Sequence, residues 1–137
     1  MNNSELIKAA LDARKYSYSP YSDFAVGAAL LCKDGTVYTG CNIENSAFSP
    51  TNCAERTAFF KAVSEGKRDF EKIAVVGGNS SEDLPLNFCP PCGVCRQVMM
   101  EFCNPDEFVI VMAKSETDYK VKRLKEIFPD GFGPDNL

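Results

Sequence analysis

The sequence has 137 residues, of which 45% are hydrophobic and 25% charged, and its formal net charge is −4. This length fits one domain, residues 1–137, whose core is large enough to need no disulfide framework. A nucleic-acid polymer requires a basic groove that neutralises phosphates, and the 15 scattered basic residues offer none. We therefore expect no nucleic-acid partner, and we expect a helix to spread the densest basic run, Lys120–Lys125, over a solvated face.

The N-terminal half combines a helix with a hairpin. Apolar residues recur at helical spacing after Ser4, a candidate N-cap, and predict a helix that ends near Tyr16–Tyr18. Two apolar runs, 24–32 and 36–41, flank an Asp-Gly turn and predict a β-hairpin. A second helix is predicted over 53–65, with Gly66 after its last turn.

The C-terminal half is predicted to alternate between strands and helices. The sequence predicts a buried strand over 73–78, a helix over 92–102 and a strand over 108–112. A last strand at 120–121 precedes a short helix and a Pro/Gly-rich tail from 129 to 137. Helices that alternate with buried strands are typical of the α/β class, so we expect a three-layer α/β/α sandwich around a mixed five-stranded sheet.

The cysteines indicate metal chemistry. The N-terminus lacks a signal-peptide pattern, and no apolar run is long enough to span a membrane, so we expect a cytoplasmic protein with no membrane partner. Thiols stay reduced in the cytosol, where seven cysteines point to metal binding or catalysis instead of disulfides. The chain has no histidine, so thiolates and carboxylates must supply both metal ligands and proton carriers.

Two predicted helices begin at cysteines. Cys53 opens one, and Cys92-Gly93-Val94-Cys95 opens another, where residues three apart share a helical face. Helix N-termini stabilise thiolates, and three protein ligands leave the fourth position of a catalytic zinc ion open. Cys53, Cys92 and Cys95 are therefore the predicted ligands of one zinc ion per subunit.

Glu55 and Arg56 follow the first ligand directly. Three thiolates would leave zinc with a net charge of −1, which weakens it as a Lewis acid, and Arg56 is placed to compensate by donating to the sulfurs. Glu55 lies two residues after Cys53 and is the candidate that moves protons between water and substrate.

Other interpretations of the cysteines stay open at this point. Cys89 forms a second C-x-x-C with Cys92 and could close a structural zinc site, or the pairs could be redox-active. Cys32, Cys41 and Cys103 lie in apolar patterns and are expected to be small buried hydrophobes.

Several segments resemble the small homotetrameric, zinc-dependent cytidine deaminases. Cys53-Ala54-Glu55 followed by Pro91-Cys92-Gly93-Val94-Cys95 is similar to the three-cysteine form of the zinc deaminase signature. The likeness covers Tyr18 to Leu137 and includes the segments 24–29, 42–45, 52–58 and 92–98. It implies hydrolysis of cytidine and deoxycytidine to uridine and deoxyuridine in pyrimidine salvage, with Glu55 protonating ring N3 and then the departing amine.

The resemblance also implies substrate contacts. Asn42 and Glu44 would bind the ribose, which agrees with their polar groups facing one way on either side of Ile43. Phe24 would pack against the pyrimidine. Phe132 would reach the site of a neighbouring subunit, so that a homotetramer shares its active sites. Ala54 and Phe48 complete the implied substrate contacts.

Two departures from the family pattern stand out. Phe48 replaces a tyrosine that many relatives carry, which removes a phenolic hydrogen bond. The approach from Asn87 to Pro91, with Cys89, is longer than usual and is expected to alter a surface loop. The alternative functions are deamination of another small aminonucleoside, such as a blasticidin-like antibiotic, deamination of a polynucleotide, or a non-catalytic structural zinc module.

Overall fold

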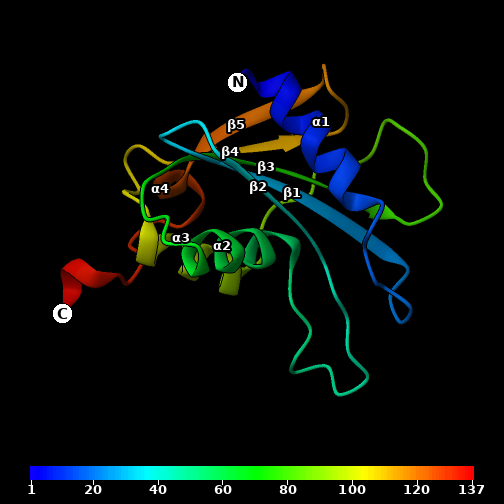
Figure 1. Cartoon of the computed structure of the whole chain (residues 1–137), viewed down its shortest axis with the longest axis horizontal. Coiled ribbons are helices and arrows are strands. Elements are labelled where there is room, and N and C mark those ends of the chain that lie inside the picture. Colours follow the sequence, from blue (N-terminus) through cyan, green and yellow to red (C-terminus); the bar gives the residue numbers. More distant parts are fainter.

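The computed structural model describes residues 1–137, and its helices and strands alternate along the chain (Figure 1). In chain order the elements are α1 (Asn3–Arg14), β1 (Phe24–Cys32), β2 (Val37–Cys41), α2 (Ala54–Ser64), β3 (Phe70–Asn79), α3 (Gly93–Phe102), β4 (Val109–Ala113), β5 (Tyr119–Arg123), α4 (Leu124–Ile127) and the 3-10 helix η1 (Pro134–Asn136). No helix is long and apolar enough to cross a membrane.

The five strands form one mixed sheet in the order β2-β1-β3-β4-β5. β3 and β4 are parallel, and every other neighbouring pair is antiparallel. The hairpin predicted around Asp34-Gly35 is β1–β2, and Gly35 adopts the positive φ of 93° that its turn requires. The predicted α/β class with a mixed five-stranded sheet is confirmed.

Helices cover both faces of this sheet (Figure 1). On one face, Leu6, Ile7 and Ala10 of α1 pack against alternate residues of β1, β3 and β4. On the other face, α2, α3 and α4 bury the side chains of Phe59, Met99 and Leu124 against the sheet in a larger cluster. Fully burying a large apolar side chain contributes about 1.5–3 kcal/mol, so these two clusters fix the three layers.

The first helix differs from the prediction at both ends. Asn2, not Ser4, is its N-cap: Asn2 Oδ1 accepts from Glu5 N at 2.8 Å, and the Glu5 carboxylate accepts from Asn2 N at 3.0 Å. This capping box satisfies two donors at once, which a cap at Ser4 would not. The helix stops at Arg14, before Tyr16, because the chain must straighten for Tyr18 to pair with Ile43.

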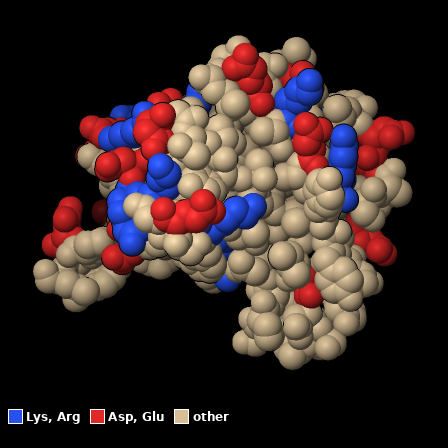
Figure 2. Space-filling view, in the orientation of Figure 1, with Lys and Arg blue, Asp and Glu red and all other residues tan.

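The basic run is the second correction. Residues Tyr119–Arg123 form the edge strand β5, whose residues are all exposed. The strand expected at 120–121 is therefore confirmed, and the expectation that a helix carries the basic run is wrong for these residues. Pairing with β4 places Lys120 opposite Met112 and Lys122 opposite Ile110. Lysines on an edge strand hinder pairing with another chain. The four basic residues of the run are exposed as expected. Figure 2 shows basic and acidic side chains interspersed, with no continuous basic face in that view.

The start of α2 lies directly on the hairpin. A Cβ added to Gly40 of β2 would meet Ala54 O and would lie 2.6 Å from Ala58 N. Only glycine permits this approach, which brings the first turn of α2 against β2. The preceding residue, Cys53, is thereby held over the sheet, next to the start of α3.

Candidate active site

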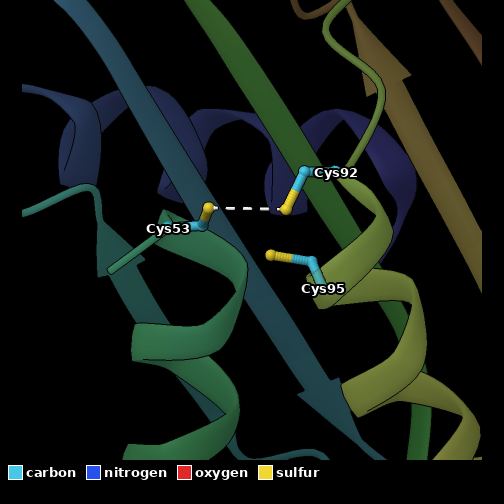
Figure 3. Close-up of side chains that lie close together, drawn as sticks. All are labelled: Cys53, Cys92 and Cys95. Atoms are coloured by element: carbon cyan, nitrogen blue, oxygen red, sulfur yellow. Dashed lines mark hydrogen bonds between the residues drawn. The ribbon is translucent and has the colours of Figure 1, made fainter. Parts of the chain in front are cut away.

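Three cysteines converge from the starts of two helices (Figure 3). Cys53 is the N-cap of α2, Cys92 is the N-cap of α3, and Cys95 lies in the first turn of α3. Their Sγ atoms all lie within 4.8 Å of one another, and the Cys53 and Cys92 sulfurs are 3.7 Å apart. Neither N-cap side chain forms a capping hydrogen bond with its helix, so the sulfurs are free to face one point.

This arrangement fits zinc. Two thiolates bound at ~2.3 Å to a tetrahedral ion are separated by about 3.8 Å, close to the distance found between Cys53 and Cys92. The set of sulfurs contains three members, and Cys89 is not among them. Three thiolates at helix N-termini are a donor set for a zinc site with an open fourth position.

Arg56 lies beside the sulfurs. Its Nη2 donates to Cys53 Sγ at 3.1 Å, and its Nε is buried without a hydrogen-bond partner. Hydrogen bonds, from Cys95 first and then from Arg56 and Cys92, lower the pKa of Cys53 to about 5 against the effect of burial. The guanidinium therefore favours the thiolate form that a metal requires.

Glu55 is buried at the same place. It is the second residue of α2, and only 4% of its surface is exposed. Burial is the main cause that raises its pKa to about 7, and the nearby Cys53 adds to the rise. A carboxyl group with a pKa near neutrality can both accept and release a proton.

A cavity of about 250 Å³ opens above Glu55 and two of the cysteines. The predicted site residues that line it are Phe24, Asn42, Glu44, Cys53, Ala54, Glu55 and Cys92. They come from β1, from the segment after β2, from the start of α2 and from the start of α3. The cavity holds an aromatic side chain, polar groups and the buried carboxyl around one space, which suits a small polar heterocycle.

Asn42 and Glu44 are also bound to the chain itself. Asn42 Oδ1 accepts from Val26 N at 2.9 Å and from the Ser17 hydroxyl, and its Nδ2 donates to Phe24 O at 2.7 Å. An amide offers two donor hydrogens, so Asn42 keeps one for a ligand. These bonds hold the residue rigidly at the cavity wall.

The Glu44 carboxylate accepts three hydrogen bonds from the turn before β1. Oε1 accepts from Tyr21 N and Ser22 N at 2.9 and 3.2 Å, and Oε2 accepts from Ser22 Oγ at 2.5 Å. The hydroxyl of Ser22 is the first of the causes that lower the pKa of Glu44. The ionised carboxylate is thus fixed in place and retains acceptor capacity for a hydroxyl group.

Two predicted substrate residues lie outside this cavity. Phe48 is 70% exposed and lines a neighbouring hollow of about 440 Å³ with Tyr21, Ser22, Glu44 and Thr51. Phe132 is 57% exposed, and its carbonyl accepts from Gln97 Nε2 at 2.7 Å. It belongs to the C-terminal segment that projects from the body of the chain (Figure 1).

Sequence reasoning missed several wall residues. Cys89 and Pro90 line the cavity, so the approach to Cys92 forms part of its wall. The position of Cys89 three residues before Cys92 was the signal in the sequence that this residue lies near the site. Ser22 also lines the cavity and holds Glu44, but nothing in the turn sequence indicated that contact. Cys32 is buried as expected, whereas Cys41 and Cys103 are only partly buried.

The fold and the three-cysteine site define a zinc-binding α/β domain. Residues 1–112 match the family described as "Cytidine and deoxycytidylate deaminase zinc-binding region". The chain belongs to this cytidine and deoxycytidylate deaminase family.

Similar proteins support the assignment. A cytidine deaminase of Sporosarcina psychrophila is 47% identical over 137 residues, covering 100% of this chain and 96% of the relative. One of Halalkalibacterium halodurans is also 47% identical, covering 100% and 98%. The crystal structure of cytidine deaminase from Burkholderia pseudomallei has a TM-score of 0.86 and 43% identity, covering 96% of this chain and 100% of that chain.

Proposed function

We propose that this protein hydrolyses cytidine and deoxycytidine to uridine and deoxyuridine, with release of ammonia, in pyrimidine salvage. The observation that carries the proposal is the cavity of about 250 Å³ in which the buried Glu55 lies beside the sulfurs of Cys53 and Cys92. The family assignment supports the same reaction, since the relatives reported above are named cytidine deaminases.

Each side chain then has a role. A zinc ion held by three protein ligands supplies Lewis-acid activation of water. With zinc bound, Glu55 would take one proton from the attacking water and deliver it to N3 of the ring. It would then take the second proton from the hydroxyl group added to the ring and deliver it to the departing amine. Arg56 offsets the negative charge of the thiolates through its bond to Cys53. Because the Glu55 carboxyl group is buried, bulk water does not compete with it for the proton.

The cavity wall accounts for substrate choice. Phe24 offers an aromatic surface to the pyrimidine, and Ala54, which has no exposed surface, adds a small apolar contact. Asn42 and Glu44 supply a donor and an acceptor to the ribose hydroxyls. A ligand without the sugar leaves those polar groups unpaired, which is costly.

The first prediction concerns this choice. With equal concentrations of cytidine and free cytosine, we expect uridine and ammonia from cytidine, and a kcat/KM for cytosine lower by about 10⁴-fold. Chromatography of the products measures both reactions under the same conditions. Equal rates for nucleoside and base would remove the ribose roles of Asn42 and Glu44, and turnover of neither would refute the proposed reaction.

A homotetramer with shared active sites is the second part of the proposal. Large apolar side chains are exposed around the loops that flank the cavity: Tyr18, Tyr21, Phe24, Ile43 and Phe48. Such surfaces mark interaction sites. In Figure 2 the lobe formed by the loop after β2 is largely uncharged. Phe132 lies outside the cavity of its own chain, so we assign it to the site of a neighbouring copy.

The location of the protein is a further part of the proposal. All seven cysteines are free, which supports a cytoplasmic location.

Mixing two defective variants tests the sharing. Phe132→Ala protein lacks the donated ring, and Glu55→Gln protein lacks the proton carrier. After dissociation and reassembly together, we expect activity above that of either variant alone, because some sites combine an intact Glu55 with an intact Phe132. The control is reassembly of Glu55→Gln protein with the Glu55→Gln/Phe132→Ala double variant. This mixture should recover no activity, because no subunit in it carries an intact Glu55. Mixed oligomers, verified by mass, that gain no activity would contradict shared sites.

A further inference from the structure

Arg96 holds both carbonyl groups that flank Cys92. Its backbone N–H donates to Cys92 O at 3.0 Å, which is the first helical bond of α3. Its side-chain Nε donates to Pro91 O at 2.8 Å. Two successive peptide planes around a metal-binding cysteine are therefore oriented by one residue.

The same guanidinium reaches a third carbonyl. Arg96 Nη1 donates to Ile127 O, at the last residue of α4. No backbone N–H and no other side chain donates to Pro91 O or to Ile127 O, and Pro91 is buried. Arg96 also has no carboxylate within ion-pair distance, so the carbonyls of Pro91 and Ile127 are the only protein acceptors of its side chain. The planar guanidinium suits this task because its N–H groups diverge in a fixed geometry.

Cys92 depends on such restraint more than the other two ligands do. Cys95 belongs to the buried core, and Cys53 packs against it, whereas Cys92 is exposed and is absent from that cluster. Its side chain forms no capping bond to α3. Packing therefore does not fix the direction of the Cys92 Cα–Cβ bond, and the backbone on either side of Cys92 must do so.

We propose that Arg96 is a positioning residue for the metal: it fixes Cys92 by tying the carbonyl before it to the C-terminal end of α4. The proposal rests on zinc binding by Cys53, Cys92 and Cys95, as the proposed function does, but it does not depend on which substrate is turned over. Residues that orient metal ligands typically contribute 10–100-fold in metal affinity.

Zinc affinity measured by competition with a chelator tests the proposal. Arg96→Met keeps the apolar stem and the backbone N–H but removes the guanidinium, and we expect about 10–100-fold weaker zinc binding. Cobalt(II) substitution provides a second readout: thiolate-to-cobalt absorption bands should weaken or shift when Cys92 is misplaced. Circular dichroism verifies that the variants are folded.

Arg68→Met is the matched control. Arg68 Nη1 also donates to two carbonyls, Val63 O at 2.9 Å and Lys67 O at 2.8 Å, but at the far end of α2. We expect it to leave zinc affinity and the cobalt spectrum unchanged. If Arg96→Met does not fold, Arg96→Lys serves instead, because one ammonium cannot reproduce the two divergent bonds. A folded Arg96 variant with the zinc affinity and cobalt spectrum of Arg68→Met would overturn the proposal, whether or not the protein deaminates cytidine.

Discussion

The Glu55→Gln variant is expected to retain its zinc and its fold while kcat falls by about 10²–10⁴-fold, the usual contribution of general acid–base catalysis. Glutamine has nearly the same shape as glutamate but cannot carry a proton. The side chain of Glu55 is buried in the cavity wall beside Cys53, so no bulk water replaces its function. The measurement is steady-state turnover of cytidine together with zinc content.

Glu71→Gln is the control for this change. Glu71 is an exposed residue of β3, and its substitution removes the same charge without touching the cavity. Its kcat should equal that of the parent. Normal turnover by zinc-loaded Glu55→Gln protein would exclude Glu55 as the proton carrier.

Loss of a sulfur ligand is expected to remove both the metal and the activity. Cys92→Ala is the cleanest ligand variant because Cys92 is exposed and its removal leaves no cavity in the core. We expect zinc binding to drop and cytidine turnover to fall to the level of the zinc-free protein. Zinc content after gel filtration and the rate of turnover measure the two effects on one sample.

Cys89→Ser separates a catalytic from a structural zinc site. The Cys89 sulfur does not belong to the set that lies within 4.8 Å, so this variant should keep its full zinc content. Because Cys89 lines the cavity, the KM of the Cys89→Ser variant for cytidine is measured on the same sample. Loss of zinc from Cys89→Ser protein, equal to that from Cys92→Ala, would favour a closed four-sulfur site without catalysis.

Much of the fold could be predicted because periodicity and turn chemistry are local. The Asp34-Gly35 turn and its flanking strands agree with β1 and β2. Errors arose where a distant contact decided the outcome. Pairing of Tyr18 with Ile43 ends α1. Pairing with β4 extends the strand expected at 120–121 to Tyr119–Arg123, where a helix was expected to carry the basic run. Neither partner is visible in the local sequence.

The metal site was also predictable, because the motifs that form it are local in the sequence. A C-x-x-C at a helix start and a third cysteine before another helix restrict where the sulfurs can point, and the structure brings Cys53, Cys92 and Cys95 together. The supporting contacts were not predictable. The bond from Ser22 to Glu44 and that from Arg96 to Ile127 join residues far apart in the chain, and only the assembled fold reveals them.

Zinc dependence of cytidine turnover tests the central claim most directly. Purified protein is incubated with cytidine while the loss of ultraviolet absorbance is followed, first as prepared, then after a chelator has removed the metal, and finally after zinc is restored. We predict deamination by the native protein, none by the metal-free protein, and recovery with one zinc ion per subunit. Undiminished deamination by protein shown to be free of metal would contradict the account.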